Sequence, residues 1–191
     1  MSPIQDQKRM ETPEIIAGHD AERTAASCAA FGVSEAEFGE LRRRAAAAKA
    51  TAYCPYSQFR VGATLLARDG SFISGANVEN AAYPVGTCAE RVAFGAAVTS
   101  GFRDFRAVAV STDISPPASP CGMCRQFIRE FCSLDTPIIM FDKNEDYVVL
   151  RLKQVSSLLS ILLAGNSFDV KLLPMSFGPD QLPRPGAPGA V

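Results

Sequence analysis

Three cysteines stand in two short motifs that together could hold a metal ion. Cys88 lies in the segment Thr-Cys-Ala-Glu-Arg, and Cys121 and Cys124 lie further along the chain in Pro-Cys-Gly-Met-Cys. If each motif opens a helix, the helix dipole and the unpaired N–H groups favour the thiolate form. Three thiolates suit Zn²⁺, and three protein ligands leave the fourth tetrahedral position for water, as in catalytic zinc sites. The pattern therefore predicts an open zinc site.

Glu90 is the acid–base candidate, because it follows Cys88 by two residues and would project from the same helix start. A carboxylate there could take a proton from water and pass it to a substrate. The segment from Thr87 to Glu90 also has the sequence of a capping box, in which Glu90 would only satisfy a backbone N–H. Taken together, the two cysteine motifs favour the catalytic interpretation. Arg91 would offset the charge of the thiolates by donating to their sulfurs, or it would form an exposed salt bridge.

Two further interpretations of the cysteines remain open at this point. Cys121 and Cys124 have the spacing of a redox-active pair, which also favours helix starts. A closed structural zinc site would instead need a fourth ligand. The candidates for that ligand are His19, Cys28, Cys54 and Cys132.

The elements that would position these residues follow from apolar patterning. Ser34 is a plausible N-cap for a helix that includes 41–52, and Asp69 and Gly70 mark a hairpin between two strands. Both cysteine motifs then open helices. The expected strands are 60–67, 71–78, 107–111, 137–141 and 147–152, and the expected cysteine-bearing helices are 88–100 and 121–132. This order predicts one mixed sheet with helices covering both faces.

Composition narrows the class of protein. The 191 residues are 47% hydrophobic, which suits one domain with modest tails. Lys and Arg number 19 against 20 Asp and Glu, and Trp is absent, so neither a phosphate-binding surface nor a base-stacking groove is expected. There is no secretory signal pattern or membrane-spanning apolar run, and six cysteines without a secretory route favour metal binding or catalysis over disulfides. We expect a cytoplasmic protein that binds neither nucleic acid nor membranes.

The chain is expected to divide into three parts. Residues 1–34 are predicted to be a partly disordered tail with a short helix around 20–30, and 35–182 are predicted to form the domain. Residues 183–191 are rich in Pro, Gly and Ala and are predicted to be disordered.

Four segments carry a close resemblance to the cytidine deaminase family, and specifically to its small, three-cysteine, homotetrameric branch. They are YCPYSQFRVGA at 53–63, NVENAAYPVGTCAER at 77–91, PCGMCRQ at 120–126 and LLPMSFGP at 172–179. The resemblance implies a three-layer α/β/α fold with a mixed five-stranded sheet. It also implies zinc-dependent hydrolysis of cytidine and deoxycytidine to uridine and deoxyuridine in pyrimidine salvage.

The same resemblance implies a set of substrate-binding residues. Asn77 and Glu79 resemble the pair that hydrogen-bonds the ribose hydroxyls, and an amide and a carboxylate two residues apart share one strand face. Phe59 resembles the ring that packs on the pyrimidine. The backbone N–H of Ala89 resembles a donor to the base carbonyl. Without the resemblance, Phe59 would equally suit core packing.

Other residues resemble parts of the subunit interfaces. Phe177 resembles an aromatic residue that reaches a neighbouring subunit's site, and Tyr56 and Tyr83 resemble tyrosines near the interface, with Tyr83 also counted among the substrate-binding residues. Residues 155–171 depart from the family, because they insert a segment just before LLPMSFGP. The expected homotetramer depends on how this insertion is accommodated.

Several rival functions share the zinc pattern. An editor of nucleic acids is disfavoured by the slightly acidic chain, and a blasticidin-type deaminase by the ribose-pair residues and the SFGP motif. The alternative from another class is a non-catalytic zinc-binding paralogue of the same fold, in which the metal only joins two helices.

Overall fold

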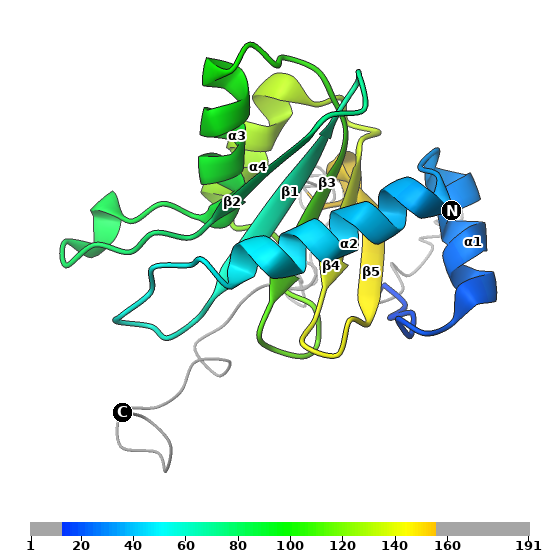
Figure 1. Ribbon diagram of the computed structural model, residues 1–191, viewed down its shortest axis with the longest axis horizontal. Helices are drawn as coiled ribbons and strands as arrows, with labels where there is room; N and C mark the ends of the chain where they lie inside the picture. The colour runs from blue at the N-terminus through cyan, green and yellow to red at the C-terminus, as the bar shows by residue number, and fades with distance from the viewer. Residues whose placement is uncertain (1–12, 156–191) are drawn as a thin grey trace, which may run out of the picture.

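A mixed five-stranded sheet forms the centre of the molecule (Figure 1). The structure is a computed structural model that describes residues 13–155. The strands, in the order β2-β1-β3-β4-β5 across the sheet, are β2 (Phe72–Ala76), β1 (Val61–Ala67), β3 (Phe105–Thr112), β4 (Pro137–Phe141) and β5 (Tyr147–Arg151). Among these five strands, β3 and β4 pair in parallel and the other neighbours pair antiparallel. The predicted hairpin joins β1 to β2, and Gly70 supplies its positive φ of 91°.

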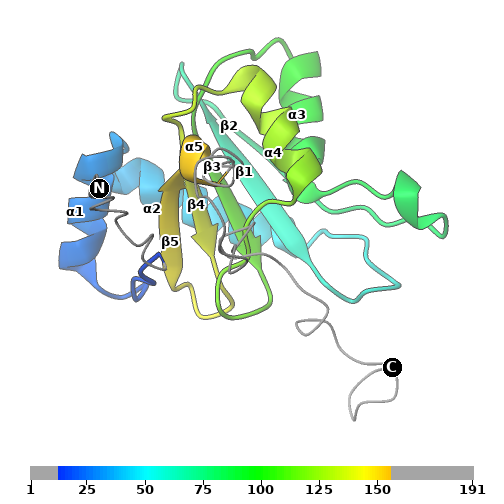
Figure 2. The same cartoon turned by 180° about the vertical axis from the view of Figure 1, so that it is seen from behind.

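Helices cover both faces of this sheet. Helix α2 (Glu35–Lys49) crosses one face, and α3 (Ala89–Thr99) and α4 (Gly122–Phe131) lie on the other (Figures 1 and 2). The remaining helices are α1 (Ala21–Phe31), the 3-10 turn η1 (Tyr83–Val85) and the short α5 (Leu152–Val155). The predicted three-layer α/β/α fold is confirmed.

The two helix layers explain why the central strands are mostly apolar on both faces. Val108 and Val110 of β3 face the cluster under α3 and α4, whereas Ala107 and Ala109 face the cluster under α2. Successive side chains of a strand point to opposite faces, so a strand buried on both sides has no polar alternation. Each layer is therefore fixed by its own apolar core.

Residues 13–33, expected to belong to a tail, pack along the β5 edge of the sheet. Ile16 and Tyr147 exchange two backbone hydrogen bonds of 2.8 Å each, so the chain adds a short bridge beside β5. The Tyr147 hydroxyl donates to Thr24 Oγ1 at 3.2 Å, and α1 begins at the N-cap Asp20. In the described part of the chain, this segment covers backbone groups that an edge strand would otherwise expose.

Three predictions fall outside the described residues. They concern the insertion beyond Val155, Phe177, and the Pro-rich segment 183–191. Within residues 13–155, no helix has the length and apolar character needed to span a membrane.

Candidate active site and metal centre

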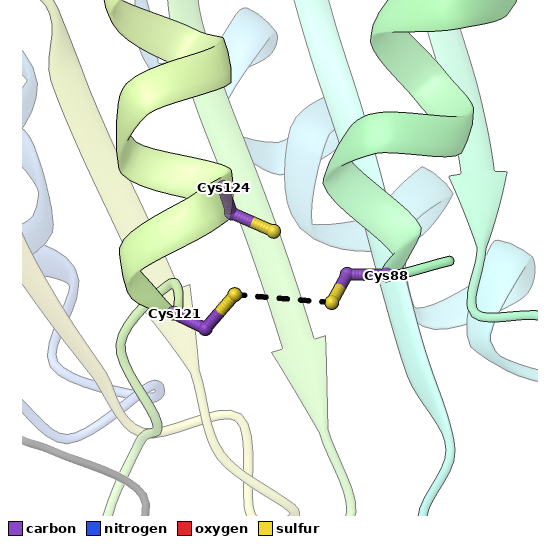
Figure 3. Close-up of side chains that lie close together, drawn as sticks. All are labelled: Cys88, Cys121 and Cys124. Atoms are coloured by element: carbon purple, nitrogen blue, oxygen red, sulfur yellow. Dashed lines mark hydrogen bonds between the residues drawn. The ribbon is translucent and has the colours of Figure 1, made fainter. Parts of the chain in front are cut away.

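Two helices begin with a cysteine at the same end of the α3–α4 layer. Cys88 is the N-cap of α3 and Cys121 is the N-cap of α4, each with extended backbone angles. Cys124 lies in the first turn of α4, so its thiol is on the same side as that of Cys121. Figure 3 shows the three thiols converging between the two helices. The packing of α3 beside α4 thus brings together the three predicted ligands.

The spacing of the sulfurs fits a metal ion. The sulfur atoms of Cys88 and Cys121 are 3.9 Å apart, and all three sulfurs lie within 4.8 Å of one another. Tetrahedral bonds of about 2.3 Å from zinc would separate two ligand sulfurs by roughly 3.8 Å. In residues 13–155 the cluster has only these three members, whereas Cys28 and Cys132 are buried in the two apolar cores. The described residues thus offer no fourth ligand for a closed structural site.

The three thiols also interact electrostatically. Hydrogen bonds from Cys124 and then Cys88 lower the pKa of the Cys121 thiol to about 2. The same contacts with Cys121 raise the pKa of Cys88 and of Cys124. A bound divalent ion would allow all three groups to ionise. The donor set suits Zn²⁺.

Glu90 is buried beside this cluster, with 4% of its surface exposed. The capping-box interpretation is wrong, because the N-cap of α3 is Cys88 rather than Thr87, which makes Glu90 the second helical residue instead of the third. Burial raises the pKa of the Glu90 carboxyl. Glu90 is therefore a buried carboxyl next to three thiols, without the local role that its sequence position suggested.

Two arginines, one on α3 and one on α4, lie close to the cysteines. Arg91 Nη2 lies 3.8 Å from the sulfur of Cys88 and 3.3 Å from the carbonyl oxygen of Gly86. The contact with Cys88 raises the pKa of Arg91. Arg125, which the sequence analysis did not single out, is 7% exposed and binds the loop before Cys121. The sequence offered one signal for Arg125, because it is a charged residue directly after the predicted ligand Cys124.

A cavity of about 300 Å³ opens beside the thiols. It is large enough for a small organic ligand. No Lys, Arg or His of the described chain lines it. The lining residues are Ser57, Phe59, Val61, Asn77, Glu79, Cys88, Glu90, Val110, Thr112, Ala118, Ser119 and Cys121.

Asn77 and Glu79 line this cavity and also brace the loop that carries Phe59. Asn77 accepts a hydrogen bond from the Val61 N–H at 2.8 Å and donates to the Phe59 carbonyl at 2.9 Å. One carboxylate oxygen of Glu79 accepts from the N–H groups of Tyr56 and Ser57. Burial opposes ionisation of Glu79, but these hydrogen bonds outweigh it and keep the pKa of Glu79 below its usual value. Both residues retain further hydrogen-bonding capacity.

The remaining predicted residues lie elsewhere. Ala89 is buried as the first residue of α3, between the cavity residues Cys88 and Glu90. Tyr83 is 74% exposed on the arm 80–87, which extends away from the sheet (Figure 1). Its ring lies 5.8 Å from that of Tyr56 and does not line the cavity. Within one chain, Tyr83 is thus separate from the candidate site.

An α/β fold with a buried carboxyl and three clustered thiols beside one cavity defines an enzyme with a candidate metal centre. A family profile described as "Cytidine and deoxycytidylate deaminase zinc-binding region" matches residues 38–140. The chain belongs to this family.

Individual relatives agree with this membership. The chain is 50% identical over 99 residues to the cytidine deaminase of Sporosarcina psychrophila, covering 52% of this chain and 73% of that protein. It is 49% identical over 106 residues to the cytidine deaminase of Halalkalibacterium halodurans, covering 56% and 80%. Its fold is similar to the crystal structure of cytidine deaminase from Burkholderia pseudomallei, with 35% identity and a TM-score of 0.60, covering 73% of this chain and 98% of that one.

Proposed function

We propose that this enzyme hydrolyses cytidine and deoxycytidine to uridine and deoxyuridine with release of ammonia, as a zinc-dependent step of pyrimidine salvage. The observation that carries the proposal is that Glu90, the pair Asn77 and Glu79, and two of the three clustered thiols line one cavity. Relatives at 50% and 49% identity are named cytidine deaminases, which supports this substrate over other amines.

Cys88, Cys121 and Cys124 would hold the metal ion through their sulfurs. Zinc bound there supplies Lewis acidity and activates water for attack on C4 of the pyrimidine. Arg91 donates toward the sulfur of Cys88 and offsets part of the negative charge of three thiolates. The protein's other contributions are proton transfer and substrate orientation.

Glu90 acts as the proton shuttle. Its carboxylate takes a proton from the attacking water and delivers it to N3 of the ring. It then moves the remaining proton of the added hydroxyl to the amine, so that the C4–N bond breaks, ammonia leaves and the C4 oxygen becomes the product carbonyl. Burial beside the cavity suits this role because the carboxyl is shielded from bulk water that would compete for the proton. Glu90 thereby carries out both proton transfers of the reaction.

The cavity residues orient a neutral nucleoside. Phe59 packs on the pyrimidine, the Ala89 N–H donates to the base carbonyl, and Asn77 and Glu79 bind the ribose hydroxyls through their unused hydrogen-bonding groups. Since no cationic side chain of the described chain lines the cavity and Glu79 is anionic, a 5′-phosphate would find no partner among these residues. We therefore favour nucleosides over nucleotides as substrates.

The enzyme is proposed to assemble as a homotetramer. An exposed apolar group surrounds the arm 80–87, and surfaces of this kind mark interaction sites. Its members are Tyr53, Tyr56, Val78, Tyr83 and Val85. By the family resemblance, Phe177 would reach the site of a neighbouring subunit, and Tyr83 would lie near the interface and take part in substrate binding.

The experiment is a spectrophotometric assay of cytidine and deoxycytidine with the zinc-loaded protein. We expect Glu90→Gln to lower kcat by roughly 10²- to 10⁴-fold with unchanged zinc content, since it removes the proton carrier and no ligand. Glu130→Gln, an exposed carboxylate on α4, is the matched control and should keep full turnover. A folded, zinc-loaded wild-type protein without turnover would instead support the non-catalytic paralogue.

A further inference from the structure

A buried guanidinium lies behind the loop that leads to Cys121. Arg125 follows the ligand Cys124 on α4, and it is 7% exposed. Burying a charged side chain is costly unless it is paired, so the contacts that this group makes indicate what it does. Burial lowers the pKa of Arg125, although Cys121 and Cys124 act in the opposite direction.

Two hydrogen bonds tie Arg125 to consecutive residues of that loop. Its Nε donates to the Pro120 carbonyl oxygen at 2.7 Å, and its Nη2 donates to Ser119 Oγ at 3.1 Å. The planar guanidinium offers these donors at fixed relative directions, which an ammonium group does not. The pair of contacts therefore sets the orientation of the loop as well as its distance from α4.

The two anchored residues have different neighbours. Pro120 directly precedes the N-cap Cys121, so its carbonyl belongs to the peptide group that fixes the Cys121 backbone. Ser119 lines the cavity, on its wall beside Ala118. One side chain thus holds both the approach to a metal ligand and part of the substrate-binding wall.

We propose that Arg125 is a positioning residue that sets the geometry of the Cys121 ligand and of the Ser119 wall together. This inference rests on the proposed function and differs from the role of Arg91, which contacts the sulfur of Cys88 directly. The planar shape of the guanidinium orients the loop through these two hydrogen bonds, so a positive charge of another shape is not sufficient. Zinc retention and substrate affinity depend on the same two hydrogen bonds.

The test compares Arg125→Lys and Arg125→Gln with the matched control Arg129→Lys. Arg129 lies one turn further along α4, and its contact is with the carbonyl of Cys132 at the far end of that helix. The readouts are the rate of zinc transfer to a chelator, the absorption spectrum of the cobalt-substituted protein, and KM and kcat for cytidine. Outer partners of metal ligands typically change affinity or activity by 10- to 100-fold.

We expect both Arg125 variants to lose zinc about 10- to 100-fold faster, to show altered cobalt absorption, and to raise KM, while Arg129→Lys stays at wild-type values. Wild-type zinc release, spectrum and KM in Arg125→Lys would overturn the proposal, because charge alone would then suffice. A lowered melting temperature with unchanged values in the folded protein would overturn it in favour of a purely structural role.

If neither Arg125 variant folds, Ser119→Ala removes one of the two bonds alone. A rise in KM of several-fold is then expected, and an unchanged KM overturns the coupling to the substrate wall. The zinc-release and cobalt measurements need no turnover. An inactive wild-type enzyme would refute the proposed function, while the metal readouts would still test Arg125.

Discussion

The N-terminus of α2 and the N-termini of α3 and α4 differ in how their N-cap side chains treat the unpaired backbone N–H groups of the first helical turn. At α2, Ser34 and Glu37 form a complete capping box, in which each side chain binds the other's backbone N–H. At α3 and α4 the N-caps are Cys88 and Cys121, and neither thiol makes a capping hydrogen bond. One helix start is satisfied locally, while the other two direct their cap side chains toward each other.

The difference is between an N-cap that stabilises its helix and an N-cap whose side chain is free to bind a metal ion. Ser is among the preferred N-caps, and such a cap stabilises a helix by about 1 kcal/mol. Cysteine at the same position forgoes that gain, and its sulfur becomes available as a metal ligand at the positive end of the helix dipole. The α2 layer thus anchors the sheet, and the α3–α4 layer holds the proposed metal ligands on the opposite face.

The largest effect is expected from exchanging the two kinds of N-cap residue. Cys121→Ser places a preferred capping residue at the start of α4, so the metal-free protein should be as stable as wild type or slightly more stable. Zinc binding should weaken sharply, and turnover should fall by roughly 10³-fold or more, because metal stabilisation of the reaction is worth several kcal/mol. Chemical denaturation with chelator, metal analysis and the cytidine assay measure the three effects.

The reverse exchange is the control. Ser34→Cys should destabilise the protein, bind no zinc of its own and leave kcat unchanged. If Cys121→Ser retained zinc and activity, the thiol cap of α4 would have only a structural role and the contrast with α2 would disappear.

A substitution of Asn77 should have the next largest effect, because this residue both stabilises a loop and lines the cavity. Two of its hydrogen-bonding groups brace the loop at Phe59 and Val61, and the residue also lines the cavity. Asn77→Ala should raise KM for cytidine by roughly 10- to 100-fold, which corresponds to about 1.4 to 2.7 kcal/mol. Steady-state kinetics with cytidine and with deoxycytidine measure this change. A variant with lower stability but unchanged KM would restrict Asn77 to the brace.

The sequence predicted the features that depend on neighbours in the chain. Asp69 and Gly70 predict the β1–β2 hairpin because a tight turn needs their backbone freedom, and the apolar runs predict strands that are buried on both faces. The spacing of Cys121 and Cys124 likewise follows from one helical turn. These signals are local, and the fold reproduces them.

What the sequence did not predict depends on distant contacts, on the conformation of a loop or on a single residue of register. The bridge between Ile16 and Tyr147 joins opposite ends of the described chain. Arg125 binds residues only five and six positions before it, but these contacts depend on the conformation of an irregular loop, which apolar patterning does not report. Moving the α3 N-cap from Thr87 to Cys88 changes the role of Glu90 altogether, and helix boundaries are uncertain by one or two residues in any pattern-based analysis.

The α2 cap itself predicts a smaller effect. Ser34→Ala removes the acceptor for the Glu37 N–H, so the free energy of unfolding should fall by about 1 kcal/mol. Zinc content and kcat should stay at wild-type values, since α2 and the thiols lie on opposite faces of the sheet. Urea denaturation together with the cytidine assay checks both parts. A comparable loss of kcat would show that the two layers are coupled.

The smallest expected effect is a pH dependence at the same cap. The hydrogen bond from the Ser34 N–H lowers the pKa of Glu37, and Arg106 acts in the same direction at 2.7 Å. A carboxyl whose pKa is lower in the folded than in the unfolded state adds stability above its unfolded value of about 4.3, and that stability is lost as the pH falls through the folded value. Glu37→Gln should therefore be less stable than wild type at neutral pH by about 0.5 kcal/mol. The gap should close below about pH 4.

Urea titrations of wild type and Glu37→Gln at several pH values between neutrality and pH 3 measure this gap. Glu22→Gln, an exposed first-turn carboxylate of α1, is the control. A gap that persisted at the lowest pH would mean that Glu37 stabilises α2 through its shape alone. The α2 cap would then depend on hydrogen-bond geometry without a contribution from charge, whereas the cysteine-capped helix starts would still depend on ionised sulfur.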